Sequence, residues 1–553
     1  MEKIWLKSYP EGVPAEIPPS EFRSIRDMFE KTFAEYPDRP SYANMGTTMS
    51  YRELDERSMQ VACYLQNSLG LNRGERVAIM LPNILQYPVV LCGIFRAGLV
   101  AVNVNPLYTA RELEHQLKDS GAKCIIILEN FAHTLEEVIG ETAVEQVLVT
   151  AVGDMLNFPK GMLTNFVLRH IKKAVPKYSL PGHLRLAAAM KIGSAQRLTP
   201  VELGFADIAF LQYTGGTTGV SKGAMLSHHN MVANVEQTIA WQAGVYDDLD
   251  GIIAITALPL YHIFSLQGNC LTGMAQGGLN VLITNPRDFE AFAKEMARYK
   301  FNLFTAVNTL FASLLNTKSF DKIDFSAVRA CIGGGMAVQP AVAKEWRERT
   351  GSPILQGYGL TESSPVAIVN RIGDEFTGSI GLPIPSTDIS IRDDDGKELA
   401  VDDIGEICIK GPQVMEGYWQ KPEETAKVMI DGGWLRTGDV GRMDDRGFIF
   451  IEDRKKDMII VSGFNVYPNE IENVVVEMDG ILEAAAIGMP DEHSGEVVKI
   501  YAVRKSPDVT EEDVMEHCRE NLTNYKRPRE IEFRDELPKT NVGKILRRAL
   551  RDE

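Results

Sequence analysis

A loop rich in glycine, threonine and lysine is the segment with the clearest potential for chemistry. It spans residues 214–223 and has the sequence TGGTTGVSKG. An apolar run over residues 208–213 precedes it, and a helical pattern begins near Ser227. Glycines let backbone N–H groups turn toward an anion, threonine hydroxyls add donors, and lysine neutralises charge. The pattern therefore predicts a strand, a polyphosphate-binding loop and a helix.

This loop is not the phosphate-binding loop of ordinary nucleotide hydrolases. The GxxxxGK[ST] pattern of those enzymes cannot be aligned on it, so it indicates chemistry other than P-loop phosphoryl transfer. A flexible surface loop is the alternative interpretation of a glycine-rich segment. The length of the string and its position after a strand favour phosphate binding.

A second loop and a nearby glycine run have residue types suited to a nucleotide. Residues 356–362 have the sequence QGYGLTE, in which Tyr358 could stack on a purine and Glu362 could hold Mg²⁺ through oxygen. Residues 333–335 are three glycines after an apolar run, which would let a flat ring approach the backbone. Each segment alone is also compatible with a simple turn.

Two further segments each end in a charged residue that could act on a bound nucleotide. Asp439 ends the sequence WLRTGD over residues 434–439, where a carboxylate could accept hydrogen bonds from ribose hydroxyls. Lys544 ends the sequence PKTNVGK over residues 538–544, where a lysine on a turn could meet negative charge in a transition state. Taken alone, the two segments could equally be a common turn and a solvated lysine.

Length, charge and cysteine content limit the classes of protein that this chain can be. Its 553 residues exceed one typical core and predict two or more domains. The net charge of −17 argues against nucleic acid as a partner. Seven scattered cysteines without a CxxC pair argue against a zinc or disulfide framework and fit a reducing compartment. With no apolar signal region at the N-terminus, we expect a cytoplasmic protein.

One segment departs from the acidic average of the chain. Residues 155–201 contain no acidic residue and eight basic ones, and apolar side chains are interleaved at roughly helical spacing between Met162 and Val175. A basic amphipathic helix can lie on an anionic bilayer surface. A solvated helix packed on the core is the alternative. The segment therefore indicates either loose association with the inner face of a membrane or an ordinary surface helix.

The order of the apolar runs predicts the fold class and the domains. Short apolar runs alternate with helical stretches through the first half, which predicts parallel sheets covered by helices. Residues 380–411 change to short β-rich runs with Asp and Gly turns and predict a small β-subdomain. We therefore predict an α/β protein with a large N-terminal domain, residues 1–455, and a small, mobile α+β C-terminal domain, residues 456–553. The charged cluster at 453–457 marks the boundary.

Taken together, these segments resemble the adenylate-forming superfamily of acyl-CoA synthetases, adenylation domains and luciferases. The phosphate loop, YGLTE, TGD, the DRKKD cluster and the terminal GK occur in that superfamily's order and rough spacing over essentially the whole chain. The closest likeness is to bacterial long-chain fatty acid–CoA ligases, at residues 433–456 and 462–470. Residues 405–411, GEICIKG, are shared with plant-type coumarate ligases. An aromatic or medium-chain acid therefore remains the alternative substrate.

The resemblance implies an enzyme that makes acyl-CoA in two half-reactions. A fatty carboxylate attacks the α-phosphorus of Mg·ATP, which releases pyrophosphate and forms an acyl-adenylate, and the CoA thiolate then expels AMP. Lys544 would bridge the carboxylate and the α-phosphate. Glu362 and Thr214 would hold Mg²⁺, and His262 would lie beside the reacting carboxyl unless it is a satisfied core histidine. A protein that only binds a nucleotide would not need Lys544.

The resemblance also implies which residues contact the nucleotide. Tyr358 would pack on adenine with the glycines at 333–335 on the other side, and Asp439 with Arg454 would bind the ribose. The full set implied for this role is Thr214, Gly215, Gly216, Thr217, Thr218, Gly219, Lys222, Gly333, Gly334, Gly335, Gln356, Gly357, Tyr358, Gly359, Thr361, Asp439 and Arg454.

The C-terminal domain would serve both half-reactions by rotating about a hinge at Lys456. After the rotation, Gly463 and Phe464 would contact CoA. The basic run at residues 526–529 could reach the nucleotide phosphates of CoA, or it is simply solvated. The resemblance alone suggests a homodimer.

A long alkyl chain needs a long apolar tunnel. Residues 263–266 and 307–311 are candidates for its lining, but apolar periodicity cannot separate a tunnel wall from ordinary core. Fatty acid, ATP and CoA are thus the expected partners, with Mg²⁺ as the cofactor.

Overall fold

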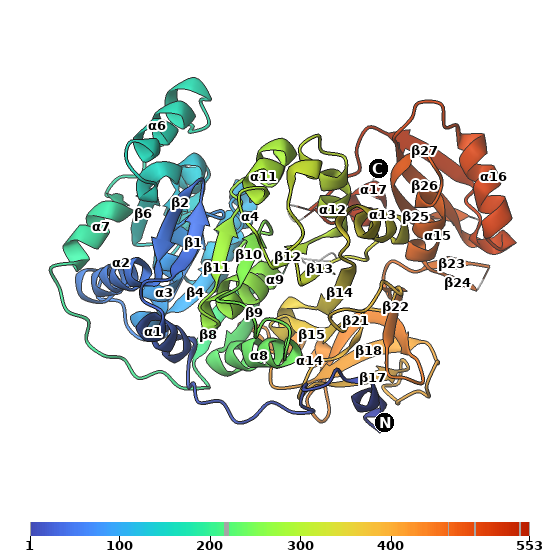
Figure 1. Ribbon diagram of the computed structural model, residues 1–553, viewed down its shortest axis with the longest axis horizontal. Coiled ribbons are helices and arrows are strands. Elements are labelled where there is room, and N and C mark those ends of the chain that lie inside the picture. Colours follow the sequence, from blue (N-terminus) through green and yellow to red (C-terminus); the bar gives the residue numbers. More distant parts are fainter. Residues whose placement is uncertain (1, 215–220, 463, 492–493, 541–542, 552–553) are drawn as a thin grey trace.

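Helices pack on and between four β-sheets within the part of the chain that the structure describes (Figure 1). The computed structural model describes residues 2–214, 221–462, 464–491, 494–540 and 543–551. Two large sheets fill one side of the molecule in Figure 1, and the C-terminal sheet lies at the opposite end. This arrangement confirms the predicted α/β fold class.

The eight-stranded sheet carries the predicted phosphate loop. Successive residues of its inner strands enter two separate hydrophobic clusters, with Val77 and Ile79 in one and Ala78 and Met80 in the other. Strands buried on both faces in this way read as continuous apolar runs. The order of the strands is β19 (Gly417–Tyr418), β9 (Lys222–Ser227), β8 (Ile208–Thr214), β4 (Val100–Asn103), β3 (Arg76–Met80), β5 (Cys124–Leu128), β6 (Gln146–Thr150) and β7 (Leu184–Arg185).

The nine-stranded sheet carries the glycine run and the YGLTE loop. Its centre is supported by an aromatic cluster in which Phe304, Phe311 and Phe320 surround Trp346, with ring centroids 4.8–5.9 Å from that of the tryptophan. The order of the strands is β16 (Leu382–Pro383), β15 (Val366–Val369), β14 (Ile354–Gly359), β13 (Ala330–Gly334), β12 (Leu303–Ala306), β10 (Ile253–Thr256), β11 (Leu279–Leu282), β1 (Pro40–Asn44) and β2 (Thr47–Ser50).

Two five-stranded sheets complete the fold. The first is the predicted β-subdomain, and it consists of β17 (Asp388–Arg392), β18 (Gly405–Lys410), β21 (Trp434–Met443), β20 (Met429–Ile430) and β22 (Ile449–Arg454). The second forms the C-terminal unit with β24 (Phe464–Val466), β23 (Ile459–Val461), β26 (Gly495–Arg504), β25 (Ile481–Asp491) and β27 (Glu530–Arg534). The boundary predicted between residues 455 and 456 falls in the segment between β22 and β23.

The helices begin and end at local sequence signals. Ser227 caps α8 and Thr109 caps α4, each in a capping box, and Gly121 ends α4 in the left-handed conformation. The helices are α1 (Ile25–Glu35), α2 (Tyr51–Cys63), α3 (Gln86–Arg96), α4 (Ala110–Ser120), α5 (Ala132–Val138), α6 (Lys160–Phe166), α7 (Leu186–Gly193), α8 (His228–Trp241), α9 (Ile263–Ser265), α10 (Thr272–Ala275), α11 (Phe289–Met296), α12 (Asn308–Leu315), α13 (Pro340–Thr350), α14 (Pro422–Val428), α15 (Pro468–Val476), α16 (Glu511–Asn521) and α17 (Arg547–Arg551).

The segment after the phosphate loop differs from the predicted strand–loop–helix order. A second strand, β9, follows the loop and pairs antiparallel with β8, and only then does α8 begin. Ala224 and Leu226 of β9 are buried and Met225 is partly buried. The mixed sequence KGAMLS contains no continuous apolar run, so it did not identify a strand. The pairing places Thr214 opposite Lys222 at the mouth of the loop.

Two further features of the described residues concern disulfide bonds and membrane-spanning helices. All seven cysteines are free and buried, and burial raises the pKa of each thiol. None of the described helices combines the length and the apolar character that crossing a bilayer requires.

Candidate active site

A cavity of about 1260 Å³ brings most of the predicted site residues together. Thr214, Gly334 and Gly359 end strands β8, β13 and β14, and ligands of open α/β sheets bind at such strand ends. The cavity lining includes Thr214, His262, Gly335, Gln356, Gly357, Tyr358, Gly359, Thr361, Glu362, Asp439, Arg454, Lys456 and Lys544. Gly215, Gly216, Thr217, Thr218, Gly219 and Gly463 lie outside the described residues.

Strand register places the nucleotide-contacting residues next to one another. In the nine-stranded sheet, Gly333 is paired with Gln356 and Gly334 with Gly357, so the glycine run lies directly beside the YGLTE loop. In the β-subdomain, Asp439 of β21 is opposite Arg454 of β22. Gln356, Gly357, Asp439 and Arg454 line the cavity, whereas Gly333 and Gly334 lie beside the YGLTE loop without lining it.

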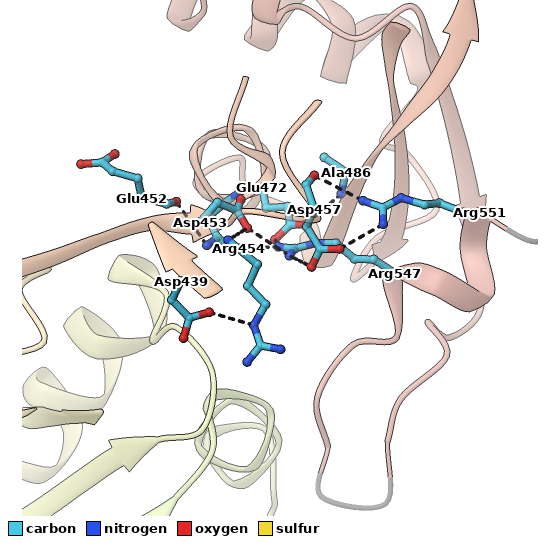
Figure 2. Close-up of polar contacts among 10 residues, drawn as sticks. Asp439, Glu452, Asp453, Arg454, Asp457, Glu472, Ala486, Arg547 and Arg551 are labelled. Atoms are coloured by element: carbon cyan, nitrogen blue, oxygen red, sulfur yellow. Dashed lines mark hydrogen bonds and ion pairs between the residues drawn. The ribbon is translucent and has the colours of Figure 1, made fainter. Parts of the chain in front are cut away.

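Asp439 is held as a buried carboxylate with a partner on each oxygen. Arg454 Nε lies 3.2 Å from Oδ1 (Figure 2). The Tyr358 hydroxyl donates to Oδ2 at 2.7 Å. Burial, followed by the nearby Asp439 charge, raises the pKa of Tyr358 well above its usual value, so the hydroxyl stays protonated and donates. The arrangement keeps a negative charge at a fixed point beside an aromatic ring, which suits a ribose next to a base.

Lys544 is presented on a tight turn that packs against the N-terminal domain. Gly543 has φ +83°, a conformation that favours glycine, and its carbonyl accepts from the Thr309 hydroxyl at 3.2 Å. A Cβ added to Gly543 would lie 2.8 Å from that hydroxyl oxygen. A Cβ added to Gly335 would lie 3.3 Å from Lys544 Cε, so the absent side chain of Gly335 makes room for the lysine.

The cavity lowers the pKa of both basic groups near the expected reaction centre. Burial is the main cause that lowers the pKa of Lys544 to about 8, and Arg454 adds repulsion while Asp439 and Glu362 oppose the shift. Burial, followed by the charge of Lys544, lowers the pKa of His262 to about 3. His262 is therefore neutral at physiological pH, where it can form a wall or a hydrogen bond but carries no charge.

Glu362 is positioned by an aromatic residue that the sequence did not single out. The Tyr418 hydroxyl donates to Glu362 Oε1 at 2.6 Å, and the ammonium of Lys222 lies 4.6 Å from the centre of the Tyr418 ring. Lys222 also pairs with Glu424 at 2.8 Å, and this bond is the first cause that lowers the pKa of Glu424 to about 2. Tyr418 and Glu424 lie outside the predicted motifs. The only sequence signal near them was the aromatic pair in EGYW, residues 416–419.

The oxygens near the mouth of the phosphate loop suit magnesium carried by a nucleotide. Within the described part of the chain, no cluster of three or more His, Cys, Asp or Glu side chains could hold a metal by itself. Mg²⁺ commonly takes one or two protein carboxylates and completes its shell with water and substrate phosphates. The Glu362 carboxylate and the Thr214 hydroxyl both line the cavity and fit that requirement.

Two residues predicted to contact a ligand, Gln356 and Phe464, make contacts within the protein instead. The Gln356 side chain accepts from Val338 N at 3.2 Å and donates to the Ser379 carbonyl at 3.0 Å, so it braces the backbone. Phe464 is 57% exposed and stacks on Tyr525, away from the cavity lining.

The basic run proposed for the CoA phosphates is already engaged. Lys526 pairs with Glu470 at 2.7 Å. Arg527 donates to the carbonyls of Leu522 and Arg519 at 2.9 and 2.8 Å. Binding of CoA phosphates by this run in the described arrangement would have to compete with these contacts.

The cavity continues into an apolar wall, which only part of the sequence analysis identified. Of the predicted tunnel segments, Ile263 and Phe264 line the cavity, whereas residues 307–311 do not. Phe311 is instead fully buried against Trp346. The apolar lining that the sequence missed comes from three strands, helix α8 and the loop after β15: Trp241, Leu303, Ile332, Val369, Ile372 and Phe376.

Comparison with known proteins places these features in a family. The family model described as AMP-binding enzyme matches residues 29–419, and the model described as AMP-binding enzyme C-terminal domain matches residues 470–544. A long-chain-fatty-acid–CoA ligase of Escherichia coli O157:H7 is 55% identical over 100% of this chain and 98% of its own length. One from Bacillus subtilis is 38% identical over 100% of this chain and 98% of its own. The crystal structure of an anthranilate CoA ligase in complex with anthranoyl-AMP covers 96% of this chain and 97% of its own, with 27% identity and a TM-score of 0.84.

The lowered pKa of Lys544 leads to a prediction about pH dependence. We expect kcat/KM for pyrophosphate release, measured without CoA, to reach a plateau below about pH 7, to be about half of it near pH 8 and to fall further above, because only the charged ammonium can bridge two anions. Arginine stays protonated throughout this range, so Lys544→Arg should move the fall beyond about pH 10 even though the rate itself is lower. A fall at the same pH in both proteins would show that another group titrates.

Proposed function

The chain belongs to the AMP-binding enzyme family, and on that premise we propose that it joins long-chain fatty acids to CoA in an ATP-dependent reaction through an acyl-adenylate. The observation that carries the proposal is a single cavity that joins Lys544, Glu362 and Asp439 to an extended apolar wall. The charged end suits a carboxylate meeting a nucleotide, and the apolar end suits an alkyl chain.

In the first half-reaction, the carboxylate of the fatty acid attacks the α-phosphorus of ATP and pyrophosphate leaves. Lys544 lowers the barrier by placing positive charge between two groups that repel one another. Tyr358 and Asp439 orient the base and the ribose, and neutral His262 borders the carboxyl without attracting a proton. Mg²⁺ held by Glu362 and Thr214 would supply charge neutralisation at the phosphates.

In the second half-reaction, the CoA thiolate attacks the acyl carbonyl and AMP leaves. Lys544 occupies the cavity in the described arrangement, so the thiol needs another approach to the carbonyl. Rotation of the C-terminal unit, residues 456–553, about Lys456 would withdraw the lysine and bring the segment with Gly463 and Phe464 toward the site. This proposal follows from the family resemblance and from the exposed, charged segment that joins β22 to β23.

An aromatic or medium-chain acid is the second candidate for the substrate. The sequence argument for it was the GEICIKG segment at 405–411. In the structure this segment is mostly strand β18, and it contributes no residue to the cavity lining. The shared segment therefore gives no information about the acyl pocket, and the long apolar wall favours the long-chain acid.

A panel of carboxylic acids tests this substrate. We expect pyrophosphate release from Mg·ATP to be greatest with acids of about 12 to 18 carbons and acyl-CoA to form only when CoA is present, because a longer chain buries more apolar surface. Acetate, octanoate and coumarate serve as comparison acids. Release that peaks with coumarate or a short acid would overturn the substrate, and no release with any acid would overturn the enzymatic function.

We further propose that the protein is cytoplasmic and associates loosely with a membrane through α6 and the turn of helix after it. Five of the twelve exposed large apolar side chains among the described residues lie between positions 158 and 171. They are Phe158, Met162, Leu163, Phe166 and Ile171, exposed by 52–85%. Figure 1 shows α6 projecting at the end of the molecule opposite the C-terminal unit.

The charges beside this apolar face favour an anionic lipid surface. Lys172 and Lys173 are exposed directly after it, whereas Arg169 and Arg185 are paired with buried Glu129 and serve the fold. Apolar insertion and lysine attraction add to one another at a bilayer, and a fatty substrate partitions there. A homodimer, expected from the resemblance alone, stays a prediction that sedimentation can test.

Vesicle binding tests the membrane proposal. We expect the double variant Lys172→Glu, Lys173→Glu to bind vesicles containing anionic phospholipid at least about tenfold more weakly, because each lysine contributes about 1 kcal/mol near such a surface. The matched control, Lys318→Glu with Lys344→Glu, makes the same charge change at exposed positions elsewhere and should bind as the wild type does. Equal binding by all three proteins would contradict the proposed surface.

A further inference from the structure

Arg547 is the centre of a largely buried ionic cluster three residues after Lys544. Its guanidinium donates to both oxygens of Glu472, from Nε at 2.8 Å and from Nη2 at 2.7 Å, and to Asn469 Oδ1 at 2.6 Å (Figure 2). Nη1 lies 3.6 Å from Asp453 Oδ1 and 3.5 Å from Asp457 Oδ2. Arg547 thus contacts one acidic residue that precedes Lys456 in the sequence, Asp453, and two that follow it, Asp457 and Glu472.

The partners of Arg547 divide into those that would move with it and one that would not. Glu472 and Asn469 lie in α15, and Glu472 also accepts from Ala486 N of β25 at 2.8 Å, so these contacts stay within the C-terminal unit. Asp453 belongs to β22 and is hydrogen-bonded into the β-subdomain. A rotation about Lys456 would keep the first set and separate Asp453 from Arg547.

Asp453 makes a second contact across the same boundary. Its Oδ2 accepts from Asn469 N in the first turn of α15 at 2.9 Å, and its side chain is only 1% exposed. The carboxylate therefore lies against both the N-terminal end of a helix and the Arg547 guanidinium, two groups that stabilise negative charge. A rotation about Lys456 that moved α15 and Arg547 away from β22 would break both contacts.

We propose that Arg547 and Asp453 form a latch that holds the C-terminal unit in the arrangement that presents Lys544 to the cavity. The proposal rests on the two-step function and on the domain rotation proposed above. Arg547 acts as a positioning residue, because it reaches the chemistry only through the segment that carries Lys544. In that segment, Leu546 N donates to Pro538 O at 2.8 Å and Lys544 N to the Thr540 hydroxyl at 3.1 Å, so backbone contacts link the residues around Lys544 to the residue before α17.

The physical character of the latch suits a contact that must open. A charge pair broken inside a protein is costly because each charge stays without water, but a rotation would release Asp453 and Arg547 toward solvent. Arg547 would also keep Glu472 as a partner after opening, which limits the cost further. The latch therefore biases a two-state equilibrium without locking it.

The test compares the two half-reactions in conservative variants. We expect Arg547→Lys and Asp453→Asn to slow single-turnover pyrophosphate release without CoA by about tenfold, the effect of losing one charge-assisted contact. Formation of thioester from supplied acyl-adenylate and CoA should be unchanged or faster, because it does not need the latched arrangement. The double variant should be no slower than the worse single variant, because both changes remove the same contact.

The matched control is Arg551→Lys on the same helix. Arg551 binds Asp457 at 3.0 Å and makes no polar contact with Asp453 within the described part of the chain, so the ratio of the two half-reaction rates should stay within about twofold of the wild type. Equal loss in the Arg547 and Arg551 variants would overturn the latch, because it would indicate general loosening of α17. Equal slowing of both half-reactions in Arg547→Lys would also overturn it.

A readout without substrates separates the latch from the proposed function. Lys455 and Lys456 are exposed in the segment between β22 and β23. We expect trypsin to cleave there several times faster in Arg547→Lys and Asp453→Asn than in the wild type or in Arg551→Lys, because an unlatched unit samples more open arrangements. Unchanged cleavage would overturn the latch even if the half-reactions proceed. Faster cleavage would support it even if no acid is activated.

Discussion

The positive charge of one lysine in the cavity is the constraint on which the rest of the structure depends. Burial disfavours the charged form of Lys544 and lowers its pKa to about 8. Asp439 and Glu362 oppose that shift and keep the ammonium charged until two anionic substrates arrive. These three groups come from the C-terminal segment, the β-subdomain and the nine-stranded sheet, so the balance exists only when all three parts are assembled.

Strand register assembles the nucleotide subsites more than any single side chain does. The pairing of Gly333 with Gln356 in one sheet and of Asp439 with Arg454 in another brings four motifs to one cavity, although they are separated by more than a hundred residues of sequence at their extremes. The Gln356 side-chain amide is an example, because both of its hydrogen bonds are made to backbone groups. The β-subdomain contributes two carboxylates, because β21 carries Asp439 in the cavity lining and β22 carries Asp453, which faces Arg547.

The sequence predicted the elements whose signals are local, together with the fold class. Capped helices and fully apolar strands, such as α4 and β5, were identified because their patterns are contained in a dozen residues. Tyr418 and Trp241 were missed because their roles arise from tertiary contacts with residues far along the chain. Residues 307–311 show the reverse error, in which an apolar run suggested a tunnel and proved to be core. Strand β9 was missed because its sequence, KGAMLS, mixes lysine, glycine and serine with its apolar residues and forms no continuous apolar run.

The concealment of all seven thiols has a practical consequence for studying motion in this protein. Each cysteine is buried, and burial raises its pKa, so at neutral pH the native molecule offers little thiolate to an electrophile. A maleimide dye should therefore react almost only with cysteines introduced on the surface, one on each side of Lys456. Energy transfer between two such dyes could follow single molecules through successive turnovers without first stripping the native cysteines from the core.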